Sequence, residues 1–501
     1  MPDIRKTGKG VTVLNGTITY INPKEKHLVF PEGALMTSKT HMHEDISFAE
    51  SVECYHTSAL DDFDILPETV ILHVINYTYS EKHRIQTIGG NKNVKNIILS
   101  TESGNESGRA GELSTKSGNE SGYAGELSCV LHSAAEPSFA GEAATESGNE
   151  SSRAEELAKT EQGSYLKSID GVVYSSDGSI LIRYPAGRTG HFDIPEGVKI
   201  IGERAFKNSA LESVSFPNSL RRLKEKAFYW CKNLKRIDFG DGITNIGDKD
   251  VPAYGDKETL VFAMCNSLTT IKFPKQVTEI GDGAFCRCKN LEKVIFPEGL
   301  KIIHQGAFWQ CTKLKDVTLP DSLEIVANGN FQATEIIRCN RVPHNLLHAQ
   351  IQNELNKFSQ TQEVTEFHIG DDIIFMPKKI SIGYTGFVTA MEILIYKQKE
   401  KYSETYQFAK TAFSKYSTAV KTCLHTKNDK ILMFLEENIL DIAAQCQTRK
   451  DNTLLRNCLI CGVKIQSDIA EELLSYITDP VLRGYILEHT RSGETEFSFT
   501  L

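Results

Sequence analysis

Residues 273–308 read FPKQVTEIGDGAFCRCKNLEKVIFPEGLKIIHQGAF, and this stretch decides the fold because its second part repeats its first. The Phe-Pro pair at Phe273 recurs 23 residues later at Phe296. The same step of 23 continues in three registers: Pro274, Pro297 and Pro320; Phe262, Phe285, Phe308 and Phe331; and Cys265, Cys288 and Cys311. Between Phe228 and Phe262 the step is 34, because 11 residues are inserted at 248–258. A fixed period of this length predicts a solenoid of stacked repeats.

Each residue of the repeat L-x-x-V-x-F-P-x-x-L-x-x-I-G-x-x-A-F-x-x-C has a mechanical role. In the copy that starts at Leu291, the residues Leu291, Val294 and Phe296 predict a short strand with its apolar side chains facing inward. Pro297 ends that strand because proline cannot donate a hydrogen bond to a neighbouring strand. A unit this small cannot bury its own apolar face, so the copies must stack. We therefore expect parallel strands near 211–216, 234–239, 268–273, 291–296 and 314–319.

These motifs resemble the BspA-like leucine-rich repeats of bacteria, as in IPEGVKIIGERAF and FPEGLKIIHQGAF. The resemblance covers roughly residues 163–331, about a third of the chain. It implies a solenoid with one strand per repeat and a role in surface attachment or protein recognition. The expected fold class is a mixed β/α repeat protein, a leucine-rich-repeat solenoid with a parallel sheet at 192–342.

The regions before the solenoid divide into three parts. Residues 1–100 are rich in predicted strands and are either divergent repeats or a small β module. Residues 101–162 contain the tandem copies TESGNESGRAGELS and TKSGNESGYAGELS, and over 101–160 acidic residues outnumber basic ones by 11 to 4. So polar a tract predicts a disordered linker. Residues 163–191 include alternating apolar residues on either side of Asp177-Gly178, which predicts a hairpin that caps the solenoid.

Beyond Pro343, apolar residues recur at spacings of three and four, as in ETYQFAKTAFSKYSTAVKTCL. We therefore expect a C-terminal α-helical domain at 343–501, with short helices in stacked pairs. The arrangement is loosely similar to ankyrin-type arrays, although no ankyrin signature is present.

The composition and the apolar stretches of the chain indicate which partners and which cellular compartment to expect. A net charge of −9 argues against a nucleic-acid-binding protein, which normally carries a basic surface. The first 26 residues contain no apolar signal sequence, and no stretch of about 18 apolar residues predicts a membrane span. The sequence therefore predicts a cytoplasmic chain, and display on the cell surface requires that the true start lies upstream.

Few residues have a spacing that suggests chemistry. Cys458 and Cys461 form a CxxC motif, but they lie in an apolar helical run, so we interpret them as a structural pair. The ligand types in HMHEDISFAESVECYH suit zinc, but their spacing matches no standard finger, and we interpret them as solvated loop residues: His41, His43, Cys54 and His56. The repeat cysteines are expected to be buried free thiols. We expect no metal, no cofactor and no catalytic residue.

The outward-facing strand positions are the main candidates for binding. In L-x-x-V-x-F the third and fifth residues face away from the core. Together they form a polar strip of Ser213, Ser215, Arg236, Asp238, Thr270, Lys272, Lys293, Ile295, Asp316 and Thr318. Three of these, Arg236, Lys272 and Lys293, form a basic spot. The strip suits a protein or a glycan, and the alternative is a sheet face that is merely solvated.

A second candidate surface follows each Ala-Phe pair. It consists of Tyr229, Trp230 and Trp309, here called the ridge, and it contains both tryptophans of the chain. Packing against the neighbouring repeat is the competing explanation.

The function predicted from these features is macromolecular recognition without catalysis. An intracellular scaffold and a surface adhesin are alternatives within that class. The alternative from another class is an enzyme or effector whose active site lies in the helical tail, although 371–501 offers no nucleophile–base pair.

Overall fold

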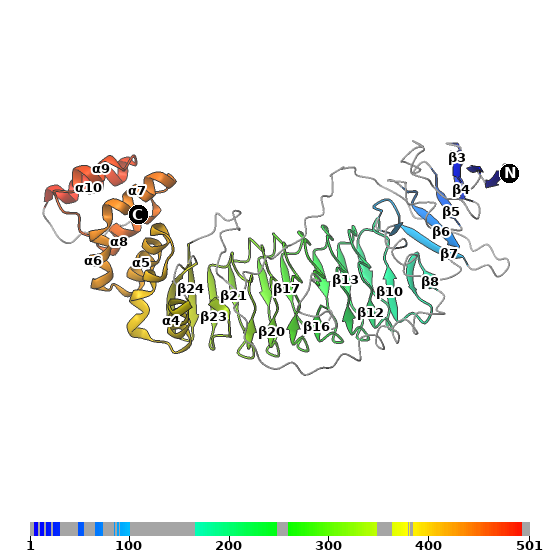
Figure 1. Ribbon diagram of the computed structural model, residues 1–501, viewed down its shortest axis with the longest axis horizontal. Coiled ribbons are helices and arrows are strands. Elements are labelled where there is room, and N and C mark those ends of the chain that lie inside the picture. The colour runs from blue at the N-terminus through cyan, green and yellow to red at the C-terminus, as the bar shows by residue number, and fades with distance from the viewer. Residues whose placement is uncertain are drawn as a thin grey trace.

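The computed structural model describes residues 5–8, 11–14, 17–21, 24–30, 49–54, 66–73, 85, 88–89, 91–100, 166–247, 259–347, 363–378, 380 and 384–492. Along its length, the molecule places β-strands of the N-terminal hundred residues at one end, a long solenoid in the middle and helices at the other end (Figure 1). The expected linker at 101–162 lies outside the described residues.

The central solenoid has two rows of strands. The front sheet is the row β11 (His191–Asp193), β13 (Ser213–Ser215), β15 (Arg236–Asp238), β17 (Thr270–Lys272), β19 (Lys293–Ile295), β21 (Asp316–Thr318) and β23 (Ile336–Cys339). The rear sheet is β12 (Ile200–Ile201), β14 (Arg222–Leu223), β16 (Asn245–Ile246), β18 (Glu279–Ile280), β20 (Ile302–Ile303) and β22 (Ile325–Val326). Every pairing that the structure describes between these strands is parallel. The predicted parallel solenoid and its strand positions are therefore confirmed for the front sheet, but the central turns carry a second short strand in the rear sheet, where the resemblance implied one strand per repeat.

One column of phenylalanines fills the centre of the solenoid. Neighbouring rings stack nearly face to face, with centroids 5.2 Å apart between Phe262 and Phe285 and 5.6 Å apart between Phe285 and Phe308. The backbone holds this spacing, because the amide of Phe285 donates to the carbonyl of Ala307 in the next turn at 2.8 Å. The 23-residue period thus repeats a backbone hydrogen bond and a ring contact together. The full column is Phe206, Phe228, Phe262, Phe285, Phe308 and Phe331.

The N-terminal strands include divergent solenoid turns. Strands β4 (His27–Phe30), β5 (Ser51–Cys54), β6 (Thr69–His73) and β7 (Asn96–Ser100) form a parallel sheet. Before them, β1 (Arg5–Gly8), β2 (Val11–Leu14) and β3 (Thr17–Ile21) form an antiparallel meander. Of the two interpretations of residues 1–100, the parallel sheet favours divergent repeats and the meander adds a small β unit to them.

A hairpin lies between the N-terminal turns and the central solenoid. Its two strands are β9 (Val172–Ser175) and β10 (Ile180–Arg183), and β8 (Leu166–Ile169) pairs antiparallel with β9. The turn at Gly178 has a φ of +79°, as an Asp-Gly turn requires. Val172 belongs to the central core, whereas its neighbour Val173 belongs to the N-terminal core. Both faces of the hairpin are therefore buried, so it joins two stacks of turns in addition to covering the first central turn.

The expectation of helix from residue 343 onward is wrong for its first part. Residues 364–377 form an antiparallel hairpin of β24 (Val364–Ile369) and β25 (Asp372–Pro377), and β24 extends the front sheet by pairing with β23. Residues 365–369 alternate between buried and half-buried with a period of two before a turn at Gly370, which has a φ of +63°, and a short apolar run follows the turn. That period is typical of strands, and the helical periodicity begins only after it.

The helices fall into two groups. The apolar side chains Ala390 and Leu394 of the first helix belong to the solenoid core, so this helix closes the end of the stack. The later helices surround a separate core that includes Leu435, Ile442 and Leu455. The helices are α4 (Tyr384–Ile395), the 3-10 helix η2 (Lys399–Phe408), α5 (Ala412–Thr426), α6 (Asp429–Glu437), α7 (Ile439–Arg449), α8 (Thr453–Cys461), α9 (Ala470–Ser475) and α10 (Pro480–Ser492). The loose similarity to ankyrin arrays remains a prediction.

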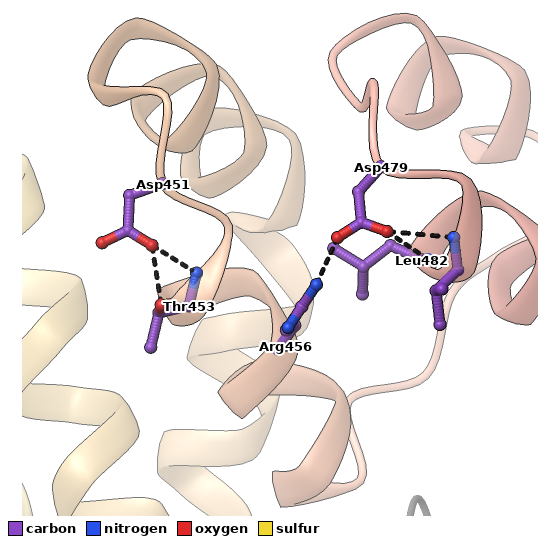
Figure 2. Close-up of polar contacts among 6 residues, drawn as sticks. Asp451, Thr453, Arg456, Asp479 and Leu482 are labelled. Carbon is purple, nitrogen blue, oxygen red and sulfur yellow. Dashed lines mark hydrogen bonds and ion pairs between the residues drawn. The ribbon is translucent and has the colours of Figure 1, made fainter. Parts of the chain in front are cut away.

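Two aspartates cap the starts of α8 and α10, and one of them also joins these two helices (Figure 2). Asp451 accepts from the amide of Thr453 at 2.9 Å at the start of α8. Asp479 accepts from the amide of Leu482 at 3.3 Å at the start of α10, and its other oxygen pairs with Arg456 of α8. The hydrogen bond from Arg456 is the largest of the causes that lower the pKa of Asp479. One carboxylate therefore caps one helix and ties it to another.

Candidate functional site

The polar strip lies on the outer face of the front sheet, as the sequence predicted. In β17, β19 and β21 the middle residue is buried and the residues on either side are exposed. Ile295 is the one strip residue with a large apolar side chain, and 40% of it is exposed. All of the strip side chains from Arg236 to Thr318 are exposed, and Ser213 and Ser215 are half-buried.

Strand pairing brings the strip residues into two columns. The register places Arg236 beside Ser213 and Asp238 beside Ser215. It also places Lys293 beside Thr270 and Ile295 beside Lys272. Adjacent strands lie about 4.8 Å apart. Lys272 and Lys293 come from the paired strands β17 and β19, and β15, which carries Arg236, contacts β17. The three cations of the basic spot therefore lie on three successive strands.

Within the described part of the chain, the three cations of the basic spot make no ion pair. Two lysines just outside the strip do form ion pairs. The ammonium of Lys235 lies 2.8 Å from the carboxylate of Glu212, and that of Lys313 lies 3.3 Å from the carboxylate of Glu292. The contrast has a simple cause. Each paired lysine lies near a glutamate of the preceding turn, whereas Arg236 has Ser213 and Lys293 has Thr270 beside it on the preceding strand. The basic spot is therefore the part of the strip whose positive charge is not neutralised by ion pairing.

Both ends of the strip carry polar clusters that satisfy their own hydrogen bonds. At the N-terminal end, Nδ1 of His191 lies 2.8 Å from the hydroxyl of Ser213, and Nε2 lies 2.8 Å from Asp193. At the C-terminal end, Arg338 pairs with Asp316 at 3.1 Å. Sequence reasoning missed the second cluster, because β24 was expected to be helical; its members are Asp316, Arg338, Glu366 and His368.

A scan against family models matches six copies of the BspA type leucine rich repeat region, over residues 188–250 and 258–365. The solenoid is a BspA-type leucine-rich-repeat region. The matched residues contain all of the polar strip, and they reach the start of β24, beyond the predicted solenoid boundary at residue 342. A comparison with curated proteins gave no match.

Solved structures of leucine-rich-repeat proteins resemble parts of the chain. A leucine rich cell surface protein from Faecalibacterium prausnitzii is 21% identical, with 58% of each chain covered and a TM-score of 0.32. A leucine-rich repeat protein from Bacteroides ovatus is 13% identical, with 68% of this chain and 64% of that one covered and a TM-score of 0.30. The T. pallidum leucine rich repeat protein is 23% identical, with 35% and 73% covered and a TM-score of 0.23. The chain thus covers less than two thirds of the first two proteins.

The aromatic side chains of the ridge pack against neighbouring residues and are only partly exposed to solvent. Tyr229, Trp230 and Trp309 are all half-buried. Tyr229 and Trp309 pack against a small apolar cluster outside the main core, formed by Leu260, Ala263 and Cys286. Cations cover the tryptophans, with Lys232 4.6 Å from the ring of Trp230 and Arg287 5.1 Å from that of Trp309. These contacts favour the packing explanation for the ridge.

The repeat cysteines form a buried column beside the phenylalanines. The thiol of Cys288 donates to the carbonyl of Phe262 at 3.2 Å, and that of Cys311 donates to Phe285 at 3.2 Å. Burial raises the pKa of Cys288 to about 12, which keeps it protonated. Each thiol therefore satisfies a carbonyl of the preceding turn. The column comprises Cys231, Cys265, Cys288 and Cys311.

The remaining sequence candidates offer no metal site among the described residues. Cys54 is buried in β5, and His41, His43 and His56 lie outside the described residues. The described residues contain no group of three or more His, Cys, Asp or Glu side chains arranged to hold a metal. None of the helices that the structure describes is long and apolar enough to cross a membrane.

Proposed function

We propose that this chain is a non-catalytic recognition protein that binds an acidic protein segment across the polar strip. The observation that carries the proposal is the basic spot: three exposed cations on successive strands without ion pairs in the described structure, on a chain whose net charge is −9. Local charge of this kind steers an oppositely charged partner and makes association sensitive to salt. Ile295 adds an apolar contact beside Lys272.

The two end clusters set the limits of the proposed contact surface. Their side chains already bond to one another, so a partner gains less by replacing those bonds than by pairing with free cations. We therefore place the main contact over β15, β17 and β19, with the end clusters as its borders.

We also propose that the partner is cytoplasmic. Every cysteine in the described part of the chain is a free thiol, and ten of the eleven are buried. Free thiols are typical of a reducing compartment. A cell-surface adhesin is the alternative within the binding class, and a partner recovered only from outside the cell would favour it.

The test compares two triple variants of the full chain. R236E/K272E/K293E reverses the basic spot. K235E/K301E/K313E makes the same change in charge at exposed lysines that are paired with glutamates outside the strip. A partner that binds the wild type and the second variant but not the first supports the proposal, provided that all three proteins unfold at the same temperature.

Equal loss of binding in both triple variants would mean that only overall charge matters, and it would contradict recognition by the strip. Retention of binding in both would move the contact elsewhere. W230A and W309A then test the ridge, with stability as the control because a buried tryptophan truncated to alanine costs about 3–5 kcal/mol. A captured glycan instead of a protein would correct the class of partner.

A further inference from the structure

The helical tail brings together two cysteines that are far apart in the sequence. Helices α5 and α8 pack against each other, and both contribute to the core of the tail. Cys423 lies in the last part of α5 and is buried, and Cys461 is the last residue of α8 and is half-buried. Cys461 is therefore the one described cysteine that is not fully buried.

The side chain of Cys461 points toward α5. Its sulfur lies 3.7 Å from the carbonyl oxygen of Val420, one turn before Cys423. The two thiols also form a hydrogen bond with each other. This bond lowers the pKa of Cys423, although burial acts in the opposite direction. The same bond raises the pKa of Cys461, so Cys423 ionises more readily and is the sulfur suited to attack after the more accessible Cys461 has met an oxidant.

The CxxC spacing in the sequence suggests a different pair, which the helix disfavours. Cys458 and Cys461 lie three residues apart in α8. Helical residues at this spacing have Cβ atoms about 5–6 Å apart, whereas a disulfide needs about 3.5–4.5 Å. A Cys458–Cys461 disulfide would thus require the end of α8 to unwind. Contact between α5 and α8 supplies a partner for Cys461 without such a change.

We propose that Cys423 and Cys461 are a redox-modification site that a peroxide converts reversibly into a disulfide between α5 and α8. In the first step the thiol of Cys461 and hydrogen peroxide give a sulfenic acid and one water. In the second step the sulfur of Cys423 attacks the sulfur of Cys461, the S–S bond forms and a second water leaves. The two thiols lose two electrons and two hydrogens in total, and a dithiol reductant restores them.

The site lies where oxidation can affect the whole tail. Helix α5 helps to anchor the tail to the solenoid, because it contacts β25 and its Ser414 hydroxyl donates to the carbonyl of Glu363 at 3.2 Å. A disulfide would tie this anchor helix to α8, in the middle of the array. Oxidation would therefore stiffen the tail while leaving the polar strip unchanged.

The experiment uses the full chain treated with hydrogen peroxide, then alkylated and digested with trypsin. Cleavage after Lys421, Lys427, Arg456 and Lys464 places Cys423 in peptide 422–427 and both CxxC cysteines in peptide 457–464. We expect these two peptides to be cross-linked, with the loss of two hydrogens, and to separate after treatment with dithiothreitol. The cross-link should persist in C458S and disappear in both C461S and C423S.

Three outcomes would overturn the proposal. One is peptide 457–464 alone with two hydrogens missing, which would mean that the CxxC pair reacts. Another is oxidation of Cys461 to a sulfinic acid without any cross-link. The third is an unchanged cross-link in C461S. Circular dichroism of the reduced C461S and C423S variants checks that they fold. Either variant removes one cysteine of the pair, so if one of them fails to fold, the other still tests the proposal.

Discussion

Arg338 donates from Nη1 to Nδ1 of His368 at 2.9 Å, across the pairing of β23 with β24. The same guanidinium bonds to Asp316 on its other side, and His368 bonds to Glu366 at 2.6 Å through its second nitrogen. A chain of four polar side chains thus runs across three strands at the border of the polar strip. In it, the carboxylate of Asp316 and the guanidinium of Arg338 neutralise each other at the edge of the strip.

Replacing Asp316 by asparagine should strengthen the binding of the acidic partner. D316N releases Arg338 from its ion pair and adds one positive charge to the strip. Exposed ion pairs contribute about 0–1 kcal/mol, so we expect an increase in affinity of up to about fivefold, measured by titration calorimetry. The increase should shrink at high salt. D321N, which removes an exposed carboxylate bonded to Asn340 outside the strip, is the control, and an equal gain there would contradict a local effect.

Truncation of the phenylalanine column should destabilise the solenoid. Phe285 is fully buried between two stacked rings, so F285A creates a cavity and should cost about 3–5 kcal/mol in the free energy of unfolding. Ile295 is exposed on the strip, and I295A should change stability by less than about 0.5 kcal/mol. Denaturant titration followed by circular dichroism measures both. A similar loss in the two variants would mean that the strip is covered in solution.

Lys378 should make stability depend on pH. Burial is the main cause that lowers its pKa to about 7 from 10.5, and its ammonium donates to the carbonyl of Gln332 at 3.3 Å. The other charged groups that act on it are Lys315, Glu335, Glu363 and Lys421. Because the folded pKa is lower than the unfolded one, the unfolded chain binds more protons between about pH 7 and 10.5. The contribution of Lys378 to stability therefore rises with pH across that window.

The variant K378M isolates this contribution. It should be more stable than the wild type near pH 7, by on the order of 2 kcal/mol, and the difference should shrink toward pH 10. Urea midpoints at several pH values measure the difference between the two proteins, which cancels the titration of the cysteines. K301M removes a lysine that is exposed and paired with Glu324 and that does not act on Lys378, so its difference from the wild type should be nearly constant. A constant difference for K378M would contradict a lowered pKa.

Proteolysis within 101–162 should leave the two halves of the chain associated. The N-terminal turns bond to the central solenoid, because Arg188 donates to the carbonyl of Lys95 at 2.6 Å and to the side chain of Asn96 at 2.8 Å. Val173 and Ile182 of the hairpin also belong to the N-terminal core. We expect the cut protein to elute as one species in native buffer and to separate in denaturant. Free release of a fragment that starts near Gly163 would show that this junction is weak.

Alkylation should distinguish the solenoid thiols from those of the tail. Cys265, Cys288 and Cys311 are buried and bonded to carbonyls, so a neutral alkylating reagent should modify them only after unfolding. Cys461 is half-buried and should react first. Mass spectrometry over time gives the order. Rapid native labelling of the three solenoid thiols would contradict the buried column.

The sequence alone determined the repeat region, because a repeated backbone hydrogen bond and a repeated ring contact both demand a fixed period. The steps of 23 between Phe262, Phe285 and Phe308 therefore predicted the stack, the parallel strands and the outward positions of Lys272 and Lys293. The hairpin around Gly178 was also predictable, because an Asp-Gly turn is a local property of the backbone.

Only the tertiary structure decided which distant residues meet. The alternation of side chains in β24 is a local property of the sequence. The pairing of β24 with β23 is not local, because about 25 residues separate the two strands along the chain. The contact between Arg338 and His368 depends on that pairing. Spacing suggested Cys458 as the partner of Cys461, whereas helix packing supplied Cys423, 38 positions away. The sequence predicted the positive charge of the basic spot, but it did not predict that these three cations lack ion pairs. That depends on which carboxylates the neighbouring turns bring within reach.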